Sequence, residues 1–218
     1  MNASRRRLVV LGALLLASAA SCGLVAVRIA HTGSPNFVYL VWNLFLAWVP
    51  FVFALLAYAY ARRAWAIAAL GFGWLLFFPN APYIATDFIH LRSHAAAPLW
   101  YDLLTISAFA GTGLALGFAS LYLMQAVVRR ELGTIASWIA VVTASGLAGV
   151  GVYLGRFLRA NSWDMLTNPD LFARLARIRL ADPFGNPKLL AVAASFMILI
   201  SVGYAFVYAV ARPLLEDG

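Results

Sequence analysis

Charged side chains are scarce in this sequence: Asp, Glu, Lys and Arg together make up 11% of its 218 residues. Soluble domains carry about 25% charged residues, because polar groups must cover their surface. In contrast, 64% of this chain is hydrophobic. This combination excludes a water-soluble fold. It predicts an all-α, polytopic transmembrane helical bundle in which residues 1–218 form a single integral membrane domain.

Cysteine is nearly absent as well, since Cys22 is the only one and lies inside the first apolar run. An intramolecular disulfide is therefore impossible. The formal net charge is +8, yet most arginines lie at the ends of apolar runs and form no basic stripe interleaved with aromatic residues. We therefore expect the lipid bilayer as the partner of this chain, and no nucleic acid.

Six apolar runs cover approximately residues 8–30, 37–60, 64–78, 103–128, 135–154 and 189–211. The first run follows three arginines and begins like a signal peptide, and the residues before Cys22 also resemble a lipoprotein cleavage site. Its length of roughly 20 residues spans a bilayer core, which favours an uncleaved helix. The sequence therefore predicts about six membrane-spanning helices.

Basic residues at the helix ends predict the orientation of the bundle. Those in the short connections and at the termini all fall on one side of a six-helix topology, which we expect to be cytoplasmic: Arg5, Arg6, Arg7, Arg62, Arg63, Arg129, Arg130 and Arg212. A longer segment on the outer side is also basic. From Asn168 onward its apolar residues fall on one helical face, which predicts an amphipathic interfacial helix in the last outer loop. That helix either anchors the loop or binds anionic headgroups.

The third run stops at Pro79, only roughly 22 Å long at 1.5 Å per residue, and apolar residues resume at Tyr83. We expect a broken or obliquely continued third helix. Pro79 and Pro82 lack the N–H groups that would bind the carbonyls of Leu75 and Phe78, so two carbonyls should be freed. A helix restarting at Asn80 would offer its N-terminus to an anion; the alternative is a kink set by packing.

Asp87, His90 and His94 follow the break at helical spacings of three and four. Together they would be a weak divalent metal site, and alternatively Asp87 would orient His90 as a general base. Simple exposure of these side chains to water at the interface is the third possibility. We treat Asp87 and His90 as the candidate catalytic pair, and the pattern indicates no particular cofactor.

Further polar residues fall on the same predicted side of the membrane. Asp102 opens the fourth run and is expected either to share a proton with Asp87 or to pair with Arg156 or Arg159. The two arginines are three apart and would clamp a phosphate or carboxylate, or join a structural ion-pair network. Inside the second run, Asn43 requires a partner, and contact between helices is favoured over contact with a ligand. The candidate ligand-binding residues are Asn80, Tyr83, Thr86, Asp102, Arg156, Arg159, Asn161 and Asp164.

Three motifs carry a family resemblance: FFPNAPYIATDFIHL at residues 77–91, WYD at 100–102 and YLGRFLRANSWD at 153–164. Together they resemble a family of bacterial multi-pass membrane proteins, domain of unknown function 1361. The likeness extends from about Asn36 to the last apolar run. It implies a location in the bacterial inner membrane, and it implies no activity.

Three functions fit these patterns. The clustering of Asp, His and Arg on one side favours a membrane enzyme acting on an anionic or lipid-linked substrate. The broken third helix, together with Pro50 inside the second run, would suit a transporter or permease. Gly/Ala-rich helices would also suit a non-catalytic scaffold component. The sequence leaves the substrate and any protein partner open.

Overall fold

The computed structural model describes residues 3–91, 97–158 and 185–216, together with Thr167, Asp170, Ala173 and Arg177. These parts of the chain are helical and contain no strand. The elements are α1 (Ala3–Thr32), α2 (Val38–Tyr60), α3 (Ala64–Phe77), α4 (Asn80–Tyr83), the 3₁₀ helix η1 (Ile84–His90), α5 (Leu99–Leu132), α6 (Thr134–Leu158) and α9 (Pro187–Glu216). Within the described residues six spans are long and apolar enough to cross a membrane, which confirms the predicted all-α polytopic bundle.

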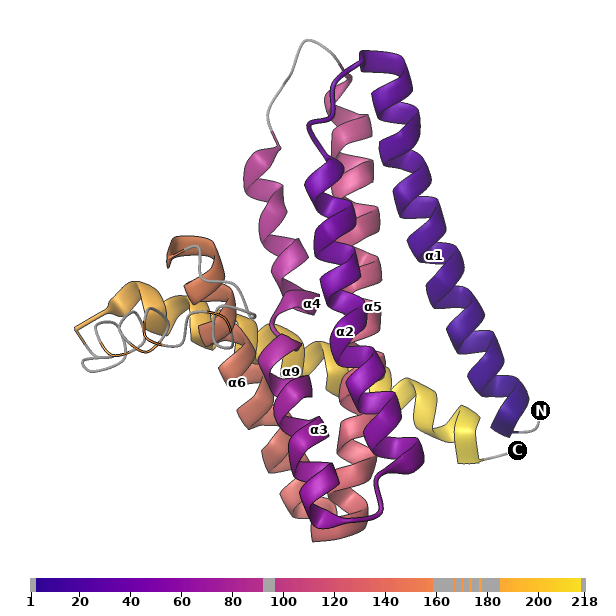
Figure 1. Cartoon of the computed structure of the whole chain (residues 1–218), viewed down its shortest axis with the longest axis vertical. Coiled ribbons are helices and arrows are strands. Elements are labelled where there is room, and N and C mark those ends of the chain that lie inside the picture. Colours follow the sequence, from indigo (N-terminus) through magenta and orange to yellow (C-terminus); the bar gives the residue numbers. More distant parts are fainter. Residues whose placement is uncertain are drawn as a thin grey trace.

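From α1 to α6 the spans run alternately up and down, so their ends gather at two ends of the bundle (Figure 1). One end, here called the basic end, carries the start of α1 and the α2–α3 and α5–α6 connections. Its exposed arginines are Arg5, Arg7, Arg62, Arg63, Arg129 and Arg130. The other end, here called the site end, carries the end of α1, the end of η1, the start of α5 and the end of α6. Helix α9 packs along α6 and crosses the other helices obliquely in this view.

Two large apolar clusters form most of the core, beside a third, small one between α6 and α9. One joins α1, α2, α4, η1 and α5, and includes Leu40, Ala81, Ile84 and Phe109. The other joins α2, α3, α5, α6 and α9. Many large apolar side chains nevertheless point outward, such as Ile198 and Phe206 on α9, which are 59% and 70% exposed. An apolar exterior around a packed core is what a bundle needs when its surroundings are hydrocarbon instead of water.

The predicted break in the third span is present, and its backbone remains helical. Phe78 and Pro79 link α3 to α4 with φ and ψ in the right-handed helical region, and η1 continues from α4 directly. One sequence-based inference is wrong, because the Phe78 carbonyl is not freed: it accepts the Ala81 N–H at 3.1 Å. The Asn80 side chain in turn donates to the Phe77 carbonyl at 2.9 Å. The break is therefore a kink at which the Phe77 and Phe78 carbonyls find local partners.

This kink packs closely against glycines of two neighbouring helices. A Cβ at Gly113 of α5 would lie 2.8 Å from the Ala81 carbonyl oxygen, and one at Gly151 of α6 would overlap the Pro79 ring. Ala81 is fully buried. Irregular helix at membrane depth must either be buried in protein or line a wet cavity. Here the kink is buried, and the packing fixes where η1 begins.

Replacing Gly113 by alanine should therefore destabilise the bundle. We expect Gly113→Ala to lower the free energy of unfolding by about 1–2 kcal/mol, because the new methyl group meets a backbone oxygen and Ile84. Gly111 on the same helix has open space at its Cβ, so Gly111→Ala is the matched control and should gain up to about 1 kcal/mol of helix propensity. Denaturation in mixed micelles measures both. Equal effects of the two substitutions would contradict the packing argument.

The predicted amphipathic helix of the last outer loop falls mainly on residues outside the described part of the chain. Of its arginines only Arg177 is described, and that residue is exposed. The second and third predicted spans agree with α2 and α3 to within one residue at each end. The observed α5 extends beyond the predicted 103–128 at both ends, because Trp100 to Asp102 and Arg129 to Leu132 continue the helix into the interface.

Candidate functional site

The site end contains a carboxylate that is almost fully buried. Asp87 of η1 is 1% exposed. Its Oδ2 accepts the Asn43 Nδ2–H from α2 at 3.0 Å, and its Oδ1 accepts an N–H from Arg156 Nη1 of α6 at 3.2 Å. Three helical segments are therefore joined at one carboxyl group. A buried charge needs such partners, since an unpaired carboxylate in an apolar interior is very costly.

The sequence placed Asp87 and His90 together, and the local helix type brings them into line. In a 3₁₀ helix there are three residues per turn, so side chains at positions i and i+3 lie directly above one another. In η1 the His90 Nδ1 lies 3.5 Å from Asp87 Oδ1, while 49% of the His90 side chain is exposed. The His90 ring also meets the edge of Tyr39, with ring centroids 5.5 Å apart. His90 is thus the part of the cluster that reaches the surface.

Arg156 contacts four residues of η1 and the segment before it. Besides Asp87, its Nη2 donates to the Thr86 carbonyl at 3.1 Å and lies 3.2 Å from His90 Nδ1. Its guanidinium also lies over the Tyr83 ring, 5.8 Å from the centroid. Tyr83 and Thr86 were both predicted as site residues, and here they form the wall and the backbone anchor for the arginine. The Arg156 side chain is 14% exposed, so the pair is not sealed from the surface.

The contact with Arg156 favours one tautomer of neutral His90. A guanidinium nitrogen donates hydrogen bonds and accepts none, so the His90 Nδ1 facing it must be the acceptor. The ring proton of the neutral form is therefore on Nε2, the nitrogen on the side away from Asp87 and Arg156. His90 thus offers its Nε2–H outside the cluster, where it can donate a hydrogen bond to a bound molecule.

A metal at this place has little support in the described residues. No group of three His, Cys, Asp or Glu gathers among them, and His94 lies outside the part that the structure describes. Both carboxylate oxygens of Asp87 already accept hydrogen bonds, one from Asn43 and one from Arg156. Asn80 was predicted to cap an anion-binding helix start. Its side-chain amide donates a hydrogen bond to the Phe77 carbonyl instead. Three further predicted residues, Arg159, Asn161 and Asp164, also lie outside the described residues.

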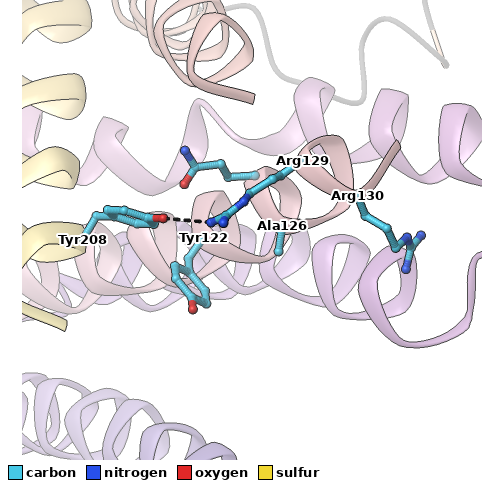
Figure 2. A pocket seen from close by; sticks show the side chains of 6 residues that line it. Tyr122, Ala126, Arg129, Arg130 and Tyr208 are labelled. Carbon is cyan, nitrogen blue, oxygen red and sulfur yellow. Dashed lines mark hydrogen bonds between the residues drawn. The ribbon is translucent and has the colours of Figure 1, made fainter. Parts of the chain in front are cut away.

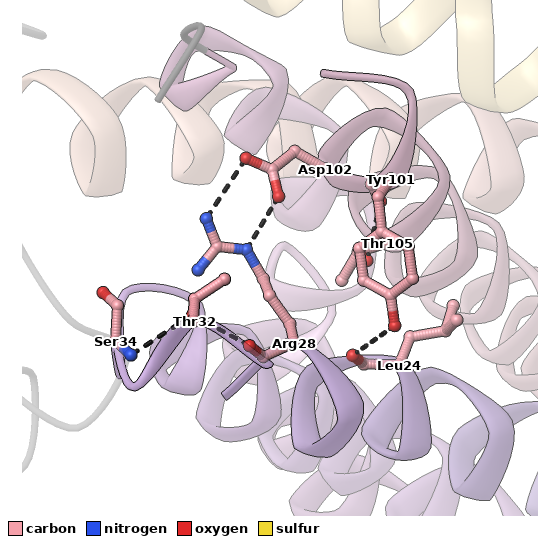
Figure 3. A network of polar contacts seen from close by, with 7 residues as sticks. All are labelled: Leu24, Arg28, Thr32, Ser34, Tyr101, Asp102 and Thr105. Atoms are coloured by element: carbon pink, nitrogen blue, oxygen red, sulfur yellow. Dashed lines mark hydrogen bonds and ion pairs between the residues drawn. The ribbon is translucent and has the colours of Figure 1, made fainter. Parts of the chain in front are cut away.

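Asp102 was expected to share a proton with Asp87 or to pair with Arg156 or Arg159, and its observed partner is different. Arg28 of α1 donates from Nε to Asp102 Oδ1 at 2.7 Å and from Nη2 to Oδ2 at 3.2 Å (Figure 3). Both side chains are 1% exposed. The physical reason is packing: α1 covers this face of α5, and the Tyr101 hydroxyl donates to the Leu24 carbonyl at 2.8 Å beside the pair. Arg156 is meanwhile engaged with Asp87.

A family model described as "Protein of unknown function (DUF1361)" matches residues 42–202. That range covers well over half of the chain. The chain belongs to the DUF1361 family. Searches of curated proteins and of solved structures return no match.

In this DUF1361 protein the matched range contains the whole Asp87 cluster apart from Tyr39, whereas Arg28 precedes it. Reasoning from the sequence missed Arg28 as a functional or structural residue. The signal was present, because a lone arginine inside an apolar run must find a partner within the bundle. Asn43 was correctly expected to have a partner in another helix, although the identity of that partner, Asp87, follows only from the folded chain.

Two buried polar atoms near these clusters have no hydrogen-bond partner among the described residues. They are Arg28 Nη1 and the Tyr39 hydroxyl. Arg28 lies over the Phe37 ring at 4.3 Å, and Phe37 in turn lies 6.2 Å from the Tyr39 ring. The two ion pairs of this DUF1361 protein are therefore neighbours at the site end, linked by a short aromatic chain at the start of α2.

Proposed function

We propose that this protein acts at the outer face of a bacterial inner membrane on an anionic or lipid-linked substrate, with the Asp87–His90–Arg156 cluster as its site. The observation that carries this proposal is that His90 is half exposed and that its ring lies beside two charged groups. These are the buried carboxylate of Asp87 and the mostly buried guanidinium of Arg156. His90 is then the group that contacts the substrate, through the hydrogen bond that its Nε2–H can donate. Asp87 is too buried to touch a substrate and serves to position His90 and Arg156.

Charge at the site end supports an anionic ligand. Asp87 neutralises Arg156, yet Lys188 at the start of α9 lies over the ring of Phe157, the residue after Arg156, at 3.9 Å. Among the described side chains no carboxylate lies within ion-pair distance of Lys188. The segment between α6 and α9 carries four arginines and three aspartates, and so adds one net positive charge: Arg159, Arg174, Arg177 and Arg179 against Asp164, Asp170 and Asp182. An excess of cations near the membrane surface attracts anionic groups.

The orientation follows from the distribution of arginines. Short connections at the basic end carry Arg62, Arg63, Arg129 and Arg130, and positively charged short loops favour the cytoplasmic side. On this basis both termini are cytoplasmic and the site end is extracytoplasmic. A substrate would then reach His90 from outside the cell or from the outer leaflet.

The buried Tyr39 hydroxyl supports a ligand here as well. It has no partner among the described residues, although its ring touches His90. Buried hydroxyl groups are normally hydrogen-bonded, so an unsatisfied one beside a candidate site is an expected contact for a substrate or a water molecule. A transporter receives less support. Its third span would have to move at the kink, and there the backbone packs closely against Gly113 and Gly151.

The test is binding of a soluble prenyl phosphate, farnesyl phosphate, to the purified protein in detergent. We expect His90→Gln to weaken binding about tenfold, because the substitution removes a hydrogen bond to a charged group. The matched control is His31→Gln, which changes the exposed histidine at the end of α1. Stability should change by less than about 1 kcal/mol in both variants.

Three outcomes separate the hypotheses. Weaker binding in His90→Gln alone supports the site, and conversion of the probe that depends on His90, followed by ³¹P NMR, makes the protein an enzyme. Binding of farnesol as tight as that of farnesyl phosphate removes the anionic substrate from the proposal. Equal behaviour of the His90 and His31 variants places the site elsewhere and favours a scaffold.

A further inference from the structure

A hollow lies at the basic end, far along α5 from the Asp87 cluster. It lies between the last turns of α5 and α9, and Figure 2 shows side chains from both helices facing it. Its volume is ≈ 390 Å³, within the range of ordinary small-molecule sites. The lining residues are Tyr122, Gln125, Ala126, Arg129, Arg130 and Tyr208. Nothing in the proposed function uses this hollow.

Aromatic residues place the hollow at the depth of lipid headgroups. Tyr208 packs against Tyr122, Trp138 and Tyr204, with ring centroids 5.2 to 6.2 Å apart. Tyr and Trp gather where hydrocarbon meets water, because their rings are apolar and their hydroxyl or indole groups need a polar partner. Arg129 and Arg130, both about two turns beyond Tyr122, end the apolar part of α5. The hollow therefore opens at the membrane surface.

The two arginines differ in how their charge is used. Arg130 donates from Nε to Glu131 Oε1 at 2.7 Å and from Nη2 to the Ala61 carbonyl at 3.3 Å. Arg129 donates from Nη1 to the Tyr208 hydroxyl at 3.3 Å, and no described carboxylate lies within ion-pair distance of it. Arg129 thus brings an uncompensated positive charge to the hollow, held in place by a residue of the other helix (Figure 2).

A neutral donor on the inner wall adds to this charge. The buried Tyr204 hydroxyl donates to Gln125 Oε1, which identifies that end of the amide as its acceptor. Gln125 therefore has its NH₂ group as a donor on a wall of the hollow. Beyond the hollow, Val207 and Val210 of α9 are exposed and apolar. A molecule bound here would meet N–H donors at its head and aliphatic side chains beside it.

We propose that this hollow binds the phosphate group of an anionic phospholipid from the leaflet at the basic end. Arg129 is the principal cation, and Tyr208 holds its guanidinium in place across the helix interface. The acyl chains lie along the apolar surface of α9. A basic hollow between membrane helices at headgroup depth is a suitable site for such lipids. A bound lipid would add to the side-chain contacts that already join α5 to α9.

The experiment is native mass spectrometry of the full-length, delipidated protein in detergent, titrated with dioleoylphosphatidylglycerol or dioleoylphosphatidylcholine. The wild-type protein should bind the phosphatidylglycerol at least about fivefold more tightly, and Arg129→Gln should remove that preference. Tyr208→Phe should weaken the preference about twofold to fivefold, because it frees the guanidinium without removing its charge. Arg62→Gln, which alters an exposed arginine at the same end, is the matched control.

Each result has a definite meaning. Loss of the preference in Arg129→Gln, with Arg62→Gln unchanged, supports the lipid site. Equal losses in the two arginine variants overturn it, since general surface charge would then explain the binding. Displacement of phosphatidylglycerol by millimolar inorganic phosphate also overturns it, because the hollow would then hold a free anion. The circular dichroism melting curve of each variant verifies that Arg129→Gln remains folded.

Discussion

Arg28→Met should lower the free energy of unfolding by about 3–5 kcal/mol, the largest effect expected of any single substitution in this chain. Arg28 and Asp102 are both 1% exposed and share two hydrogen bonds. Without the guanidinium, the carboxylate of Asp102 remains buried with no cation beside it. Unfolding in mixed detergent micelles, followed by tryptophan fluorescence and circular dichroism, measures the loss.

A double variant distinguishes lost pairing from general damage. Arg28→Met combined with Asp102→Leu removes both charges and should recover most of the stability, because apolar groups can replace a buried ion pair at little cost. The exposed pair Arg130–Glu131 is the control, with side chains 40% and 45% exposed. Glu131→Gln should change stability by less than about 1 kcal/mol. A double variant less stable than Arg28→Met alone would contradict this account.

Asp87→Asn should have the second largest effect, about 3 kcal/mol of lost stability. The new amide keeps the shape of the carboxyl group and can still accept from Asn43. It cannot balance the charge of Arg156, whose side chain is only 14% exposed. The expected loss lies at the lower end of the range for buried pairs, since water reaches Arg156 more easily than it reaches Arg28. Chemical denaturation of wild-type and variant protein measures it.

A double-mutant cycle with Arg156→Gln tests the pairing directly. In the Asp87→Asn background the second substitution should cost at least about 1 kcal/mol less than in the wild-type protein. Additive effects would mean that the 3.2 Å contact between the two side chains contributes little. The double variant should also bind farnesyl phosphate more weakly than His31→Gln does, because His90 then loses both of the charged groups beside its Nδ1.

The two ion pairs have different consequences for function. Arg28 and Asp102 are fully enclosed and connect α1 to α5, so their role is structural. Asp87 and Arg156 connect η1 to α6, and they end in a histidine that is half exposed. Of the two pairs, only Asp87–Arg156 contacts a side chain that reaches the surface, which is His90. For that reason the candidate site is assigned to His90 and its partners, and not to the more deeply buried pair.

The sequence by itself determined the class of the protein, the number of spans and the position of the kink. Length and hydrophobicity are enough for these features, because a bilayer of fixed thickness and a proline without an N–H act locally. Local spacing also placed Asp87 and His90 together, since they are one turn apart on the same element. The same reasoning identified Arg156 as a candidate at the outer end of its helix.

Only the tertiary structure decided which charges meet. Asp102 pairs with Arg28, 74 residues away, and Asp87 with Arg156, 69 residues away. Nothing in the local sequence distinguishes these pairings from the expected one between Asp102 and Arg156. The choice depends on which helices are neighbours: α1 packs on α5, and η1 follows a kink that packs closely against Gly113 and Gly151. Because van der Waals contact acts over a few ångströms, it becomes effective only after the chain has folded.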